Sequence, residues 1–135
     1  MLKKNQKGRI KNIFNTSQTL TKNRFALMAE EAGRITKSEI QGIELAIKRI
    51  LKNTQNEDGS KGKAILRIHP HRYITKKALG VRMGKGKGSI DTLITKVKPG
   101  AIIIEWLSSQ VSPFRVWAIL NSKLSIRTSL ITPKF

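Results

Sequence analysis

The sequence contains no cysteine, which excludes disulfides, thiolate metal sites and thiol nucleophiles. Aromatic residues make up only 5% of the 135 residues, so binding of nucleic acid cannot depend mainly on stacked bases. We expect Trp106 and Trp117 to pack in a core rather than against bases. No apolar run approaches the roughly 20 residues that a helix needs to span a bilayer, and the longest, Ala101–Ile104, has the length of a strand. The sequence therefore predicts no membrane partner.

Acidic residues are also scarce. Eight Asp and Glu stand against 27 Lys and Arg, which gives a formal net charge of +19 at pH 7. Self-repulsion of this size favours a polyanionic partner, because bound phosphates neutralise the cations and release condensed counterions. The basic residues run from Lys3 to Lys134 instead of gathering at one end. We therefore expect nucleic acid to contact much of the surface.

The few acids are poorly arranged for catalysis. None of them forms a pair suited to general acid–base chemistry, and Glu39 is already explained by a helix cap. His69 and His71 flank Pro70 with no carboxylate near them in sequence, and two histidines are too few ligands to predict a metal site. The sequence thus predicts no catalytic residue, metal, cofactor or small-molecule substrate.

The hydrophobic pattern predicts an α+β fold, with two helices packed on a largely antiparallel sheet. Thr36-Lys-Ser-Glu39 is a capping box that begins the first helix, and apolar residues follow at helical spacing as far as Leu51. Ser112-Pro113 predicts the start of a second helix ending near Lys123. Pro99-Gly100 predicts a turn between two strands of a hairpin. The expected strands are 25–29, 64–69, 92–98, 101–106 and 125–131.

The chain divides by composition into an arm and a domain. Residues 1–24 are polar, basic and weakly periodic, and we expect a basic N-terminal arm that phosphates bring into order. In free solution we expect these residues to form a disordered tail. Residues 25–135 are expected to form a single RNA-binding domain, with residues 70–91 inserted as a glycine-rich loop.

The most informative segment is Ala78-Leu-Gly-Val-Arg-Met-Gly-Lys-Gly-Lys-Gly-Ser89. Its glycines remove side-chain bulk, so the backbone can lie close against another surface. Cations stand between and before these glycines, which suits the loop to a narrow, negatively charged crevice in RNA. A mobile surface loop without a partner is the alternative. The glycines are Gly80, Gly84, Gly86 and Gly88, and the cations are Lys76, Lys77, Arg82, Lys85 and Lys87.

Two glycine motifs for nucleotides fail at this loop. Counted from Gly80, the phosphate loop of an NTPase needs glycine at the position of Lys85. A dinucleotide fingerprint that begins at Gly84 needs glycine where Ser89 stands, and no clear ribose-binding acid follows at the expected distance. The segment therefore favours RNA over a free nucleotide.

Several of these segments resemble a known family. Arg82-Met-Gly-Lys-Gly-Lys-Gly88 is similar to the signature of the bacterial-type large-subunit ribosomal protein sixteen. Gly33-Arg-Ile-Thr-Lys-Ser-Glu-Ile40 is similar to the start of that family's first long helix, and Ile74–Val81 resembles the stretch before its glycine loop. Lys98-Pro-Gly100 and Lys123–Thr128 agree in order and spacing. The resemblance covers nearly the whole chain.

The resemblance implies a structural constituent of the large ribosomal subunit, with the chemistry of peptide bond formation left to the RNA. It implies three partners: large-subunit rRNA, tRNA and neighbouring ribosomal proteins. The glycine loop is expected to reach toward the tRNA passage and the peptidyl transferase region. The side chains expected to bind RNA are Lys7, Arg9, Arg24, Arg34, Lys76, Lys77, Arg82, Lys85 and Lys87, and the loop backbone is expected to contribute at Gly80, Gly84, Gly86 and Gly88.

Departures from the family pattern bear on location. His69-Pro-His-Arg-Tyr73 replaces the usual Phe-Pro-Asp-Lys-Pro, and Leu93 stands where an aromatic or basic residue usually closes the signature. The chain is rich in Lys, Ile and Asn, whose codons are AT-rich. Because the resemblance begins almost at Met1, we expect no presequence. We expect an organelle-encoded mitochondrial protein, with the bacterial cytoplasm or a plastid as alternatives.

Overall fold

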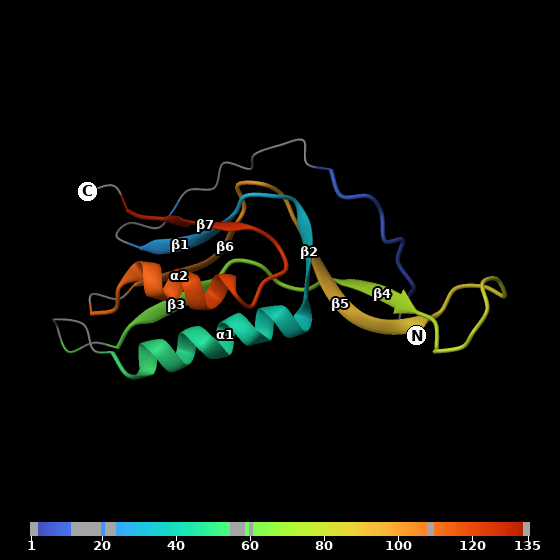
Figure 1. The fold of residues 1–135 in the computed structure, drawn as a ribbon, viewed down its shortest axis with the longest axis horizontal. Helices are drawn as coiled ribbons and strands as arrows, with labels where there is room; N and C mark the ends of the chain where they lie inside the picture. The colour runs from blue at the N-terminus through green and yellow to red at the C-terminus, as the bar shows by residue number, and fades with distance from the viewer. Residues whose placement is uncertain are drawn as a thin grey trace.

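The computed structural model describes residues 3–11, 20, 24–54, 59, 61–107 and 110–133. Within these ranges the chain forms two helices and seven strands, arranged in two sheets, and this confirms the predicted α+β fold. Figure 1 shows both helices beside the larger sheet, while the smaller sheet extends away from them toward the glycine-rich loop. No described helix is long and apolar enough to cross a membrane.

The larger sheet has the strand order β3-β6-β1-β7, and every neighbouring pair is antiparallel. β6 lies inside this sheet, and its residues from Ile102 to Trp106 are all buried, as expected for a strand covered on both faces. The sequence therefore shows an apolar run from Ala101 to Ile104 there rather than alternation, followed by the buried Glu105. The strands are β1 (Phe25–Ala29), β3 (Lys63–Leu66), β6 (Ile102–Leu107) and β7 (Thr128–Ile131).

The smaller sheet consists of β2 (Gly33–Thr36), β5 (Ser89–Val97) and β4 (Arg72–Lys76), in that order and antiparallel. The predicted loop over 70–91 is wrong in extent, because β4 lies inside it and β5 begins at Ser89. Since every residue of β4 is exposed or half-buried, the strand shows no apolar alternation in the sequence. The segment between the two strands is therefore only 77–88.

The turn at Pro99-Gly100 does not close a hairpin, contrary to the prediction. β5 and β6 flank it but belong to different sheets. Ala101 N–H donates to the Lys98 carbonyl at 3.2 Å and Gly100 has φ 83°, as in a type II turn. Gly100 N–H also donates to the Ala29 carbonyl at 2.8 Å. The turn therefore passes the chain from one sheet to the other and is held by the end of β1.

Helix α1 (Lys37–Lys52) begins at the predicted capping box. Glu39 N–H donates to Thr36 Oγ1 at 3.3 Å, and Thr36 N–H donates to Glu39 Oε2 at 2.7 Å. The other oxygen of the Glu39 carboxylate accepts from Ser125 N–H at 3.1 Å, which ties the helix start to the segment before β7. Burial raises the pKa of Glu39, but hydrogen bonds from Thr36 and Ser125 outweigh it and hold that pKa below its ordinary value.

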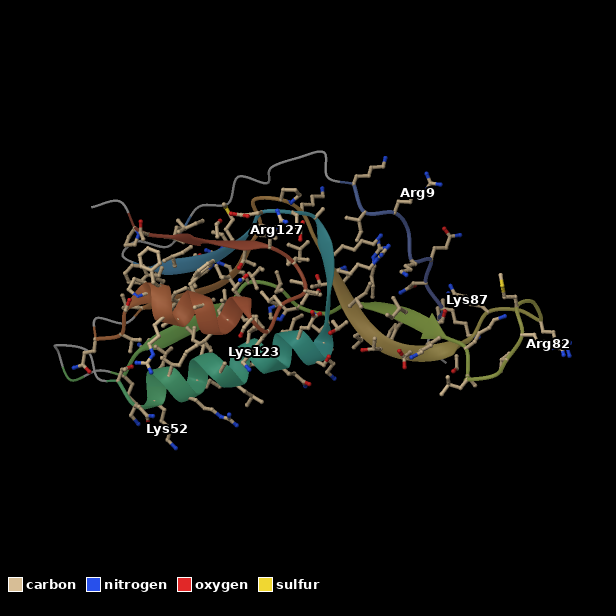
Figure 2. All side chains as sticks on the ribbon, in the orientation of Figure 1. Arg9, Lys52, Arg82, Lys87, Lys123 and Arg127 are labelled. Atoms are coloured by element: carbon tan, nitrogen blue, oxygen red, sulfur yellow. The ribbon has the colours of Figure 1, made fainter. Side chains whose placement is uncertain are left out.

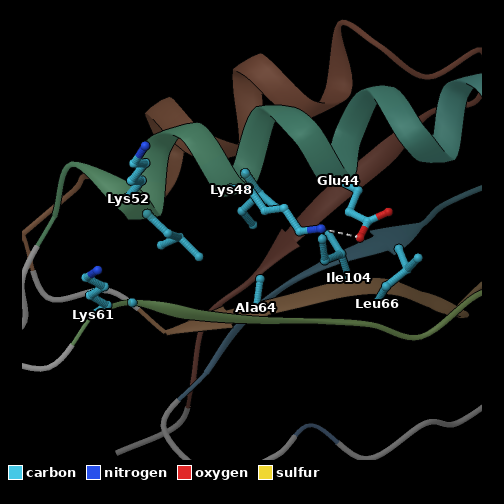
Figure 3. A pocket seen from close by; sticks show the side chains of 10 residues that line it. Glu44, Lys48, Lys52, Lys61, Ala64, Leu66 and Ile104 are labelled. Carbon is cyan, nitrogen blue, oxygen red and sulfur yellow. Dashed lines mark hydrogen bonds and ion pairs between the residues drawn. The ribbon is translucent and has the colours of Figure 1, made fainter.

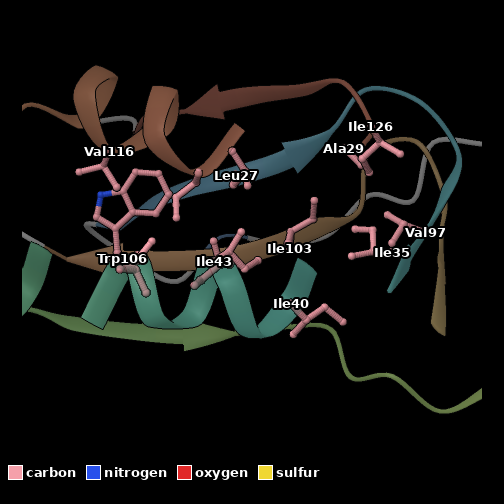
Figure 4. Close-up of a cluster of buried hydrophobic side chains, with 14 of the residues drawn as sticks. Leu27, Ala29, Ile35, Ile40, Ile43, Val97, Ile103, Trp106, Val116 and Ile126 are labelled. Atoms are coloured by element: carbon pink, nitrogen blue, oxygen red, sulfur yellow. The ribbon is translucent and has the colours of Figure 1, made fainter. Parts of the chain in front are cut away.

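The core lies between the two helices and the larger sheet (Figure 4). Trp106 is fully buried there, near Val116 of α2 (Pro113–Asn121). Trp117 is half-buried and packs against the same cluster, so both indoles lie in or against the core, as predicted. The buried residues of α1 are Ile40, Ile43, Ala46, Ile47 and Leu51. Their spacing matches the apolar stripe in the sequence, which explains why this helix could be predicted.

Candidate RNA-binding surface

The segment 77–88 joins β4 to β5 at the end of the molecule farthest from the helices (Figure 1). Every residue from Ala78 to Lys87 is exposed. Arg82 lies at the outer end of the loop, whereas Lys87 lies near its base (Figure 2). The sequence signature is therefore presented outward, away from the protein's own core.

Three of the loop glycines are required by backbone conformation rather than by space. Gly80, Gly84 and Gly86 have φ angles of 80°, 102° and 91°, and a Cβ at any of them would meet nothing within 4 Å. Lys85 between them has φ 55°, so the chain stays in the left-handed region over consecutive residues. Side chains other than glycine rarely adopt this region, so the loop shape depends on these glycines.

Gly88 serves a different purpose at the base of the loop. A Cβ on Gly88 would lie 2.6 Å from the carbonyl oxygen of Lys76, so the two ends of the loop approach more closely than any side chain permits. Lys77 Nζ donates to the Gly84 carbonyl at 2.5 Å, which folds the loop back on itself. At Gly88 the missing side chain therefore allows the two ends of the loop to pack together within the protein.

Residues 3–11 of the N-terminal arm lie along the smaller sheet. Lys87 Nζ donates to the Asn5 carbonyl at 2.5 Å, and Lys4 Nζ donates to the Lys87 carbonyl at 3.2 Å. Farther along, the Arg34 guanidinium donates to the Gly8 carbonyl at 2.6 Å. These contacts join the arm to both the loop base and β2.

Three cations gather on one face of the smaller sheet. Arg34 and Lys96 are cross-strand partners in β2 and β5, and Arg72 lies close enough to act on Lys96. Desolvation, followed by the charges of Arg72 and Arg34, lowers the pKa of Lys96 below its ordinary value. Neither of the ion pairs Lys48–Glu44 and Arg67–Glu105 of the described residues involves these three cations, and such an uncompensated cluster is the arrangement expected at a phosphate-binding surface.

Carboxylates neutralise little of this charge. Lys48 pairs with Glu44 at 2.7 Å and Arg67 pairs with Glu105 at 2.5 Å, and both of these ion pairs involve α1 or the larger sheet. We use the name arm–loop surface for the connected cations of the arm, the smaller sheet and the loop. They are Lys4, Lys7, Arg9, Lys11, Arg34, Arg72, Lys96, Lys76, Lys77, Arg82, Lys85 and Lys87.

Among the described residues, no three His, Asp or Glu side chains gather as metal ligands.

The structure brings most of the predicted residues together, with one exception. Arg24 precedes β1 in the larger sheet, and its Nη1 atom is buried with no hydrogen-bond partner among the described atoms. Arg72 and Lys96 were missed, because the segment around Arg72 was expected to be loop and its strand register was unknown. No local pattern in the sequence marks this cluster, because it depends on the pairing of β2 and β4 with β5.

Apolar side chains at the loop were also missed. Leu79 and Met83 are about fully exposed, at 102% and 99%, and Val81 is 54% exposed. Large apolar side chains in water mark a surface that a partner covers, particularly where they flank a cation. The signal was present in the sequence as Leu79, Val81 and Met83 alternating with glycine and basic residues.

A comparison with models of known protein families matches residues 1–131 to the family described as Ribosomal protein L16p/L10e. The match includes the arm, both sheets, both helices and the glycine-rich loop, and it reaches the last residue of β7. The structural role in the large ribosomal subunit that the resemblance implies is thus supported by a comparison that covers almost the entire chain. The chain belongs to the ribosomal protein L16p/L10e family, a family of structural components of the large ribosomal subunit and not of enzymes.

Proposed function

We propose that the arm–loop surface binds large-subunit rRNA, and that the loop 77–88 reaches toward the tRNA passage and the peptidyl transferase region. There it supports translation and subunit assembly by positioning RNA segments and screening their repulsion, while catalysis stays with the RNA. The observation that carries the proposal is the loop itself: its residues from Ala78 to Lys87 are exposed, its glycines determine its shape, and its cations form no ion pair with a carboxylate among the described residues.

The loop tip is suited to irregular RNA. Arg82 offers a planar guanidinium that pairs with phosphate in bidentate fashion or stacks on a base. Leu79 and Met83, on either side of it in the sequence, are exposed to water. Packing against bases or ribose would remove this apolar surface from water, which is favourable. Contact with a tRNA backbone at this tip follows from the same chemistry.

The arm and the smaller sheet are suited to phosphate backbone. A phosphate beside Arg34, Arg72 and Lys96 would relieve their mutual repulsion and raise the depressed pKa of Lys96. The hydrogen bonds from Arg34 and Lys87 hold the arm carbonyls, so the arm would enter the RNA already aligned with the sheet. We assign residues 1–24 to this arm and residues 25–135 to one RNA-binding domain. Residues 1–2, 12–19 and 21–23 of the arm, and 55–58, 60, 108–109 and 134–135 of the domain, lie outside the described residues.

The test replaces the loop cations in ribosomes. In Arg82→Gln/Lys85→Gln/Lys87→Gln, we expect translation to fall more than occupancy of the large subunit, because the arm and sheet still anchor the protein. The control is Lys37→Gln/Lys123→Gln/Arg127→Gln, which removes the same charge from exposed positions outside the arm–loop surface. Equal losses of translation and occupancy in the loop variant would reduce the loop to an anchor.

We also propose that the ribosome concerned is mitochondrial. The support is compositional, since Lys, Ile and Asn are abundant and have AT-rich codons. Locating the gene tests this directly: a mitochondrial genome supports the proposal, and a bacterial chromosome or plastid genome contradicts it.

A further inference from the structure

β3 forms an open edge of the larger sheet. Among the described strands it pairs only with β6, in a register that places Ile65 opposite Glu105. Arg67 N–H donates to the Ile103 carbonyl at 2.9 Å, which continues this register. Alternate residues of an antiparallel strand direct their backbone N–H and C=O groups to opposite sides. The backbone groups of Ile65 therefore point toward β6, whereas those of Ala64 and Leu66 point toward the open edge.

A groove lies along the same edge, between β3 and α1 (Figure 3). Its volume is about 260 Å³, and Ala64 and Leu66 line it with Ile47, Leu51 and Ile104. These are mostly apolar side chains, so the groove has an apolar floor beside peptide groups that pair with no other described strand. An extended peptide would bind to both the apolar floor and the peptide groups of the β3 edge, because its backbone pairs with β3 and its alternate side chains enter the groove.

The groove narrows at the start of β3. A Cβ on Gly62 would lie 2.6 Å from Leu51 Cδ2 and 3.1 Å from the Leu107 carbonyl oxygen, so the chain passes close against α1 there. Ile65 on the opposite face of the strand is 42% exposed. An added strand would therefore find apolar surface on both of its faces.

The rim of the groove is positively charged. Lys48, Lys52 and Lys61 line it, and its one acid, Glu44, already pairs with Lys48 at 2.7 Å. Lys63 is exposed on β3 itself. Charge complementarity therefore selects an acidic occupant. RNA would satisfy the lysines, but its phosphates and riboses would leave the apolar floor and the peptide edge without matching partners.

We propose that the β3 edge and this groove bind an extended acidic segment of a partner protein, in which acidic and apolar residues alternate, and that this segment adds a strand to the larger sheet. Apolar residues would enter the groove above Ala64 and Leu66, and acidic residues would face the lysines. The surface lies beside α1, away from the loop, so this inference does not depend on the proposed RNA contacts of the arm–loop surface (Figure 1).

The experiment titrates the full-length protein, without RNA, with a labelled peptide of alternating valine and glutamate. Ala64→Pro is the decisive variant, because proline removes the outward N–H of residue 64 while the hydrogen bonds of Ile65 to β6 remain. Its net charge equals that of the parent, so non-specific attraction is unchanged. We expect the affinity to fall about tenfold or more.

Two controls separate strand addition from charge alone. A peptide of alternating serine and glutamate carries the same charge without apolar side chains and is expected to bind much more weakly. Lys52→Gln/Lys61→Gln should weaken binding of the valine–glutamate peptide, whereas Lys37→Gln/Lys123→Gln, with the same loss of charge outside the groove, should change it little.

Amide hydrogen exchange in the unsubstituted protein tests the geometry even if Ala64→Pro fails to fold. The bound peptide should slow exchange at Ala64 and Leu66, whereas Ile65, already paired with β6, should change little. The proposal is overturned if folded Ala64→Pro binds the peptide as tightly as the parent, or if neither outward amide becomes protected. Protection of the same amides by a single-stranded RNA oligonucleotide of equal charge would also overturn it and assign the groove to RNA.

Discussion

The salt dependence of RNA binding measures how many loop cations contact phosphate. Each contact with single-stranded or duplex RNA contributes about 0.7–0.9 to the slope of log affinity against log salt concentration. Neither Arg82 nor Lys85 has a side-chain partner among the described residues, so both are available to phosphate. The double variant Arg82→Gln/Lys85→Gln should therefore lower the slope by roughly 1.4–1.8.

The consequence is a difference between parent and variant that shrinks as salt rises. From 50 to 200 mM salt, a fourfold increase, the ratio of the parent's affinity to the variant's affinity should fall by roughly 7- to 12-fold. Lys87 should add less than Lys85, because its ammonium already donates to the Asn5 carbonyl and must leave it to reach phosphate.

The assay is fluorescence anisotropy with a labelled large-subunit rRNA transcript over a series of salt concentrations. Lys37→Gln/Lys123→Gln removes the same charge outside the arm–loop surface and should change the slope less. An unchanged slope in Arg82→Gln/Lys85→Gln would refute the reasoning, because it would mean that neither loop cation displaces counterions from the RNA.

Three further predictions concern the loop shape, the helix cap and the core. Gly86→Ala should weaken binding of the rRNA transcript at constant charge, because φ 91° strains any side chain by about 1–2 kcal/mol, and anisotropy would detect no change if the loop shape were irrelevant. Glu39 has a lowered pKa when folded, so its carboxylate stabilises the fold above its unfolded pKa near 4.5, and this stability is lost as pH falls through the folded pKa. Urea unfolding should therefore show that the free energy of unfolding falls more between pH 7 and pH 3 for the parent than for Glu39→Gln. An equal fall in both proteins would contradict this. Ile43→Ala should cost about 2–5 kcal/mol of unfolding free energy in the same assay, because Ile43 is fully buried, and a cost below about 1 kcal/mol would show that the site collapses around the smaller residue.

Features that depend on neighbouring residues could be predicted from the sequence. The capping box from Thr36 to Glu39 and the apolar stripe of α1 are complete within one segment of chain, so their pattern determines them. The turn at Pro99-Gly100 has the predicted residues and the expected left-handed glycine. Its partner in the fold, Ala29, is far away in sequence, and the hairpin prediction failed for that reason.

Features that depend on distant pairing could not be predicted. β2 has four residues and is paired with β5, more than fifty positions later, so no local pattern marks it as a strand. Without that register, Arg34, Arg72 and Lys96 are three scattered cations rather than one cluster. The loop signature, in contrast, needs no register, which is why Arg82 and its neighbouring glycines were identified while the sheet face was not.

The most direct test of the central claim is crosslinking from the loop tip in assembled ribosomes. A photoreactive side chain at position 83, beside Arg82, would be irradiated in large subunits with tRNA bound, and the crosslinked nucleotides mapped. The account predicts crosslinks to rRNA of the peptidyl transferase region or to tRNA. The account would be contradicted by crosslinks confined to other ribosomal proteins. It would also be contradicted if position 83 gave no crosslink while a probe at position 9 of the arm reacted with rRNA.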